Sequence, residues 1–105
     1  MEIWNKIDDF KNYEISSFGR VKTLNFKKER FLKPSTDKDG YLKVVLHNKE
    51  IIKTFRVHQL VAMAFLSHKQ SGMKLVINHI NKIRNDNRLF NLEILTQKEN
   101  INKKY

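Results

Sequence analysis

Residues 77–93 read INHINKIRNDNRLFNLE, which is the most informative segment of the chain. It is a polar, asparagine-rich loop between short apolar runs at residues 75–77 and 92–95, which we expect to be strands. A polar loop of this length inside a compact domain is usually functional or disordered. Its asparagines would equally suit plain turns, because Asn tolerates left-handed backbone angles and bonds its own backbone. Composition alone leaves both interpretations open.

The elements around this loop follow from hydrophobic periodicity. Apolar residues recur at three- and four-residue spacing across residues 57–65, which predicts a short amphipathic helix. Residues 67–74 are polar and read as a loop. After the second strand, Thr96 with Glu99 three residues later has a capping-box pattern, so we expect a final helix that ends near Lys103.

The N-terminal half favours strands. Residues 13–24 are rich in aromatic and β-branched residues and read as an extended segment, with a bulge or sharp bend at Gly19. Residues 42–46 and 51–57 alternate with a period of two on either side of a short turn at 48–50, which predicts a hairpin. Together these segments predict a small antiparallel sheet.

Length and composition narrow the class of protein. The 105 residues suffice for one compact unit with one modest core. Lys and Arg number 21 against 11 Asp and Glu, so the net charge of +10 points to a polyanionic partner, either nucleic acid or an anionic membrane surface. The absence of cysteine excludes disulfides, cysteine-built zinc sites and thiol nucleophiles. No signal-peptide pattern is visible, and no apolar run approaches the roughly 20 residues that a membrane span needs.

The order of residues in the asparagine-rich loop resembles the HNH nuclease motif, in the version found in phage and intron homing endonucleases. His79 takes the place of the invariant histidine, and Asn87 takes that of the second residue in the motif's Asn pair. Residues 91–93 match its Asn-Leu-Glu, and residues 99–100 match its closing Glu-Asn. Residues 13–22, with Tyr-Glu-Ile-Ser-Ser-Phe-Gly-Arg-Val-Lys, look like the Trp/Tyr-Glu-Val-Ser/Gly-Arg-Val module of the same enzymes.

The segment between these two parts, residues 40–41 and 58–65, also looks like its counterpart in the family, so the resemblance covers nearly the whole chain. It implies an α+β fold. A small antiparallel β-sheet region over residues 1–56 would contact DNA, and a helix followed by a ββα-metal nuclease motif would occupy residues 57–105. It also implies a metal-dependent DNA endonuclease that nicks one strand per active site, in the cytoplasm of a bacterial host or of a phage-infected cell.

The residues suit this chemistry. Phosphodiester hydrolysis needs an activated water, help for the leaving oxygen and neutralised charge on the phosphate. His79 suits the role of general base, because an imidazole accepts a proton near neutral pH. The resemblance implies that Asn91 braces the loop and helps to orient His79, and that Asn78 and Asn100 bind one divalent metal ion, Mg²⁺ or Mn²⁺ rather than zinc. Since both ligands are neutral, we expect little metal affinity before DNA phosphate completes the coordination shell.

Basic side chains predict contacts to double-stranded DNA in two places, the sheet region and the asparagine-rich loop. The predicted DNA-contacting residues are Arg20, Lys22, Lys27, Lys28, Arg30, Lys33, Lys82, Arg84 and Arg88. For the basic residues of the sheet region, the alternative interpretation is a solvated charged face without contact to DNA. We expect His58 to be buried and structural, and Trp4, Tyr13 and Phe18 to pack in the core rather than stack on bases.

Three further points stay open from the sequence. Neither metal-ligand position carries a carboxylate, so a catalytically silent DNA-binding module is the alternative to an enzyme. A basic RNA-binding protein is the third hypothesis, although no RNA-specific motif is visible. We expect the part that reads a DNA sequence to be reduced, absent or supplied by a second specificity subunit, and a cut through both strands to need a homodimer or two visits by one active site.

Overall fold

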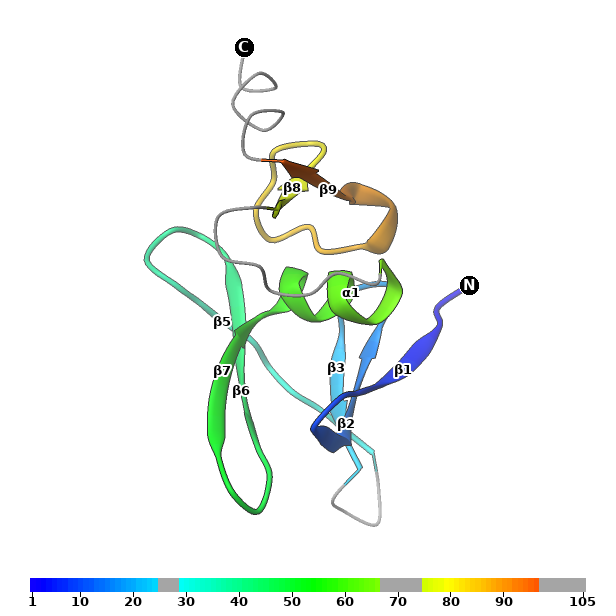
Figure 1. Ribbon diagram of the computed structural model, residues 1–105, viewed down its shortest axis with the longest axis vertical. Helices are drawn as coiled ribbons and strands as arrows, with labels where there is room; N and C mark the ends of the chain where they lie inside the picture. The colour runs from blue at the N-terminus through cyan, green and yellow to red at the C-terminus, as the bar shows by residue number, and fades with distance from the viewer. Residues whose placement is uncertain (25–28, 67–74, 97–105) are drawn as a thin grey trace.

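Short antiparallel strands surround one α-helix in the described part of the chain, which confirms the predicted α+β class (Figure 1). The structure is a computed structural model and describes residues 1–24, 29–66 and 75–96. Its elements are β1 (Trp4–Ile7), β2 (Phe10–Ser16), β3 (Val21–Thr23), β4 (Arg30–Phe31), β5 (Ser35–Thr36), β6 (Leu42–His47), β7 (Ile52–Arg56), α1 (Val57–Phe65), β8 (Leu75–His79), the 3₁₀ helix η1 (Leu89–Asn91) and β9 (Leu92–Thr96).

The second of the two N-terminal sheets, in the order β5-β6-β7, contains the predicted hairpin. Val44 of β6 lies opposite Phe55 of β7, and both side chains are buried, as the alternating pattern requires. Asn48 closes the turn, because its Oδ1 accepts hydrogen bonds from the backbone N–H groups of Glu50 and Ile51 at 2.8 and 2.9 Å. The strand ends at Arg56, where the period of two gives way to the helical period.

The first sheet, in the order β1-β2-β3-β4, differs from the prediction in two ways. The extended segment at residues 13–24 forms parts of two strands, β2 and β3, and the predicted bend is a tight turn in which Gly19 has a φ of +84°. The sequence pattern did not predict β1. The turn from β1 to β2 contains no glycine, and Asp9 takes the left-handed conformation there with a φ of +66°.

The aromatic residues of this sheet are buried to different extents. Tyr13 is buried, as expected, and Trp4 is half-buried with its ring 5.8 Å from that of Phe31. Phe18 is 48% exposed, so the expectation that it packs in the core is wrong. It lies in the turn between β2 and β3.

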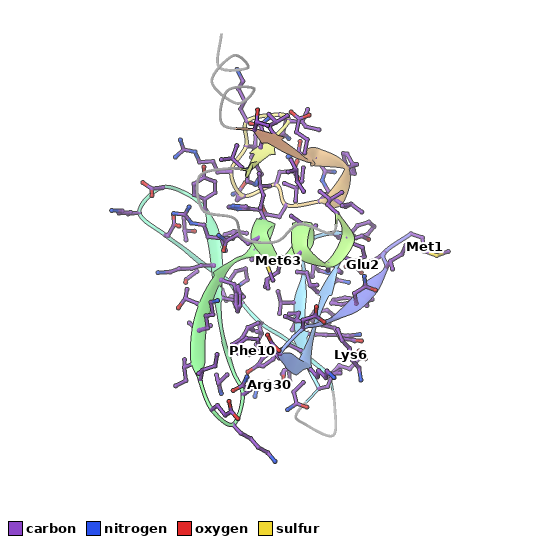
Figure 2. All side chains as sticks on the ribbon, viewed as in Figure 1. Met1, Glu2, Lys6, Phe10, Arg30 and Met63 are labelled. Carbon is purple, nitrogen blue, oxygen red and sulfur yellow. The ribbon has the colours of Figure 1, made fainter. Side chains whose placement is uncertain are left out.

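Helix α1 is the centre of the core. It contacts both N-terminal sheets and also β8, β9 and η1, and it lies between these two parts of the molecule (Figure 1). Val57, Leu60 and Val61 are at most 1% exposed. The sheets also meet directly, since the ring of Phe10, which is labelled in Figure 2, lies edge-on to Phe55 with a centroid distance of 5.5 Å.

The C-terminal strands form a hairpin of their own. The predicted strands at residues 75–77 and 92–95 are confirmed, and each is longer, with β8 reaching His79 and β9 reaching Thr96. The predicted helix after Thr96 lies outside the described residues. None of the helices in the described ranges has the length and apolar character needed to cross a membrane.

Candidate active site

The β8–β9 hairpin presents the predicted histidine and one predicted metal ligand at the start of the asparagine-rich loop. The two strands are antiparallel, with Asn78 opposite Glu93 and His79 opposite Leu92. Asn78 Nδ2 donates a hydrogen bond to Glu93 Oε1 at 2.9 Å. This bond fixes the amide so that Asn78 Oδ1 remains as the atom that can bind a cation, and it brings a carboxylate next to that atom.

His79 is 6% exposed, and a single amide holds its ring. His79 Nε2 lies 2.8 Å from Asn87 Oδ1. An amide oxygen can only accept a hydrogen bond, so Nε2 carries the proton and Nδ1 of the neutral ring keeps its lone pair. Asn87, which is itself 4% exposed, therefore selects the tautomer of His79.

Asn91 is buried and tied to the loop rather than to the histidine ring. Its Oδ1 accepts a hydrogen bond from Asn81 N at 3.0 Å, and its Nδ2 donates to Asn81 Oδ1 at 3.0 Å and to the backbone oxygen of Asp86 at 2.8 Å. The backbone oxygen of Asn91 accepts a further bond from Ile80 N. Any influence of Asn91 on His79 therefore passes through the path of the loop, and the group that touches the ring is Asn87.

An ion pair stiffens the middle of the same loop. Arg88 donates two hydrogen bonds to the carboxylate of Asp86 at 2.8 and 2.7 Å, and Asn81 Nδ2 donates a third at 2.8 Å. The Arg88 guanidinium lowers the pKa of Asp86 to about 2. Asp86 is therefore ionised at neutral pH, and it engages the charge of Arg88 within the loop.

Aromatic rings from two other elements enclose His79. His58, in the first turn of α1, lies edge-on to His79 with a centroid distance of 5.0 Å, and Tyr41, just before β6, lies 5.8 Å from it. Arg56 and Arg84 both lie over the Tyr41 ring, at 4.5 and 5.2 Å from its centroid. His58 is buried, as expected.

The predicted DNA-contacting residues of the sheet region have different surroundings. Arg20 forms a salt bridge with Glu2. Lys22 is 8% exposed, because its ammonium group lies 3.4 Å from Glu14 and 3.1 Å from Glu29. Its charge is thus matched within the chain, which the sequence did not indicate.

The remaining basic residues fall into an exposed group and an undescribed group. Arg30 and Lys33 are exposed near β4, and Lys82 and Arg84 are exposed on the asparagine-rich loop. Lys27 and Lys28 lie outside the described residues, as does Asn100, the second predicted metal ligand.

Sequence reasoning missed three side chains around His79. The sequence did single out Asn87, which matches the second residue of the motif's Asn pair, but it did not indicate that Asn87 bonds to the ring of His79. The enclosure by Tyr41 and His58 brings together residues far apart in the chain, and no sequence spacing reports it.

Comparisons with known proteins show what this chain is similar to. A model of the NUMOD4 motif matches residues 2–47. The chain is 39% identical over 103 residues to the uncharacterized HNH endonuclease L247 of Acanthamoeba polyphaga mimivirus, a match that covers 95% of this chain and 25% of that protein. It is 34% identical over 99 residues to the DNA endonuclease I-HmuI of Bacillus phage SP01, which covers 93% of this chain and 55% of the relative.

A solved structure is also similar. The chain matches the structure described as DNA binding and cleavage by the HNH homing endonuclease I-HmuI with a TM-score of 0.82 and 32% identity, over 97% of this chain and 57% of that one. The chain thus spans between 25% and 57% of the length of these relatives.

Proposed function

The chain belongs to the HNH homing endonuclease family, and we propose that it is a metal-dependent endonuclease that hydrolyses phosphodiester bonds in double-stranded DNA. The observation that carries the proposal is the 2.8 Å hydrogen bond between His79 Nε2 and Asn87 Oδ1. It supports His79 as the general base, because it leaves Nδ1 to take a proton from the attacking water. The imidazolium that results would donate a stronger, charge-assisted bond to the same amide.

Asn78 and Asn100 would hold one divalent ion, Mg²⁺ or Mn²⁺. The donor chemistry at Asn78 fits such an ion, since hard cations prefer oxygen ligands and the bond from Nδ2 to Glu93 leaves Oδ1 to bind. When bound, the ion would neutralise charge on the phosphate and on the leaving oxygen. Glu93 adds a negative charge beside a ligand pair that is otherwise neutral. We infer that this pair binds the ion weakly until DNA phosphate joins it.

DNA contact in this proposal comes from the β-rich region at residues 1–56 and from the asparagine-rich loop. The net charge of +10 and the exposed Arg30, Lys33, Lys82 and Arg84 support it. Arg20, Lys22 and Arg88 lie beside carboxylates, so each would have to exchange an internal partner for a phosphate. The roles of Lys27 and Lys28 rest on their place in the basic run of the sequence.

With one such site per chain, the enzyme would nick one strand at each binding event. A homodimer would supply the second site for a cut through both strands, and a second specificity subunit is the other proposed partner. The phage relative supports a place of action in the cytoplasm of a bacterial host or of a phage-infected cell.

Relaxation of supercoiled plasmid tests the proposal. We expect Mg²⁺- or Mn²⁺-dependent nicking that EDTA abolishes and that His79→Ala removes. The matched control is His47→Ala, which removes an exposed histidine of β6 and should nick like the wild type. Binding of duplex DNA without cleavage would favour the silent DNA-binding module instead, and preference for structured RNA would refute both.

A further inference from the structure

The turn between β2 and β3 packs directly on the asparagine-rich loop. The backbone oxygen of Ser17 accepts a hydrogen bond from Leu89 N at 2.7 Å. Two residues on, Gly19 lies against Asn87, the residue that holds the ring of His79. A turn in the N-terminal sheet is therefore in contact with the side chain next to the proposed general base.

The contact leaves no room for a side chain at position 19. A Cβ on Gly19 would lie 2.9 Å from Asn87 Cβ and 3.1 Å from its backbone oxygen. Carbon atoms pack best at about 3.5–4.0 Å, so one of the two segments would have to move. Asn87 and its neighbour His79 are both almost fully buried, and a close-packed interior transmits such a shift.

The turn itself is well held. Ser16 is fully buried, and its Oγ accepts hydrogen bonds from the N–H groups of Phe18 and Arg20 at 3.1 and 3.0 Å. Ser17 is bonded in both directions to Ile3, through Ile3 N to Ser17 Oγ at 3.0 Å and through Ser17 N to the Ile3 oxygen at 2.8 Å. The turn is therefore not free to retreat from the contact, so a clash at position 19 would shift Asn87 as well.

We propose that Gly19 is a positioning residue for His79. By allowing the turn to approach Asn87, it places the amide that selects the His79 tautomer and aims Nδ1. The inference rests on the proposed function for its catalytic consequence. Its structural part, a link from position 19 to the ring of His79, can be tested without DNA or metal.

Gly40 provides a matched control. Its φ of +89° is close to the +84° of Gly19, so alanine meets the same left-handed strain at either position. A Cβ on Gly40 would meet only Arg84 Cδ, at an ordinary distance of 3.8 Å. Gly19→Ala and Gly40→Ala therefore share the backbone strain and differ in the contact with Asn87.

The first measurement is the tautomer of His79 in the free protein, read from the nitrogen-15 chemical shifts of its two ring nitrogens. We expect the Nε2–H tautomer alone in the wild type and in Gly40→Ala, and a mixture of tautomers in Gly19→Ala. An unchanged tautomer in Gly19→Ala, or the Nδ1–H form in the wild type, would overturn the proposal. If Gly19→Ala does not fold, Gly19→Asn replaces it, because asparagine tolerates a positive φ and still carries the Cβ.

The second measurement is the single-turnover cleavage rate with saturating DNA. We expect Gly19→Ala to slow this rate about tenfold or more with little change in DNA affinity, since small misplacements of a catalytic group have effects of this size. Gly40→Ala should cleave within about threefold of the wild type. In an Asn87→Ala background, which keeps the Cβ clash but lacks the amide, Gly19→Ala should cause no further loss. An additive loss would mean that Gly19 acts on cleavage by a route other than the Asn87 amide, which would overturn the proposal.

The two measurements separate the two proposals. A changed tautomer in a protein that cleaves no DNA would refute the proposed function and leave the link from Gly19 to His79 intact. A wild-type tautomer in Gly19→Ala, with normal cleavage by the wild type, would refute the link and leave the function.

Discussion

Replacing Asn91 by alanine should destabilise the protein by about 2 to 3 kcal/mol. The substitution removes three side-chain hydrogen bonds, one accepted from Asn81 N and two donated to Asn81 Oδ1 and the Asp86 oxygen. Each is worth about 1 kcal/mol net, and because Asn81 is exposed, water can replace part of the loss. The substitution also leaves a small cavity at the buried site, which increases the loss of stability.

Urea unfolding measures this loss. With a slope of about 1 to 1.5 kcal/mol/M for a chain of this size, the midpoint should fall by about 2 M. The control is Asn85→Ala, which removes an exposed asparagine of the same loop and should change stability by less than about 0.5 kcal/mol. Asn91→Asp preserves the volume and the bond from Asn81 N but loses both donors, so it should be at least as destabilising as alanine.

The reasoning fails if Asn91→Ala unfolds at the same urea concentration as Asn85→Ala. It also fails if Asn91→Asp is as stable as the wild type, because volume rather than hydrogen bonding would then hold the loop. In either case the loop would be held by its apolar neighbours, and the hydrogen bonds of Asn91 would contribute little.

Three other predictions concern the ion pair of Asp86, the proposed metal ligand Asn78 and two of the basic residues. Arg88 lowers the pKa of Asp86 from 3.8 to about 2, so the stabilisation from this carboxylate is complete above about pH 4 and is lost as the pH falls toward 2. The urea midpoint should therefore fall less across this pH range in Arg88→Ala than in the wild type, and an equal fall in both proteins would refute the stabilising role of the ion pair. Calorimetry should detect no saturable Mg²⁺ binding to the free protein, and binding that appears only with DNA should weaken in Asn78→Ala; tight binding to the free protein would contradict the neutral ligand set. The slope of log affinity for DNA against log salt should fall by about one in Lys82→Gln but by less in Lys22→Gln, because the Lys22 ammonium already forms salt bridges with two carboxylates. Equal slopes for the two variants would show that Lys22 leaves these carboxylates to bind DNA.

Where periodicity carries the information, sequence reasoning predicted the fold well. The alternation around Val44 and the helical spacing that includes Leu60 gave β6, β7 and α1 nearly to the residue, because each has one face in the core. The strand β1 has no such pattern. Trp4–Ile7 is held by pairing with β2, and the chain reverses through Asp9, one of the few non-glycine residue types that visit the left-handed conformation routinely.

The spacing of the motif in the sequence predicted which residues belong to the site, but not which of their side chains are in contact. Motif order singled out His79 and Asn91, and the structure gives both buried positions in the β8–β9 region. Which asparagine touches the histidine ring depends on how the loop turns between the two strands, and that path is fixed by internal bonds such as those of Asp86. The approach of Gly19 to Asn87 depends on how two distant parts of the chain pack, so no local pattern reveals it.

Helix α1 has a consequence for how such a chain can be divided or recombined. One short helix of nine residues packs against the N-terminal sheets and against the β8–β9 hairpin at the same time, and its Val57, Leu60 and Val61 are buried in the core. A cut on either side of α1 would strip one of its faces, so neither fragment would retain a complete core. An exchange of the N-terminal sheets between homologues would therefore have to include the face of α1 that packs against them. The sheets and the helix would then be transferred together.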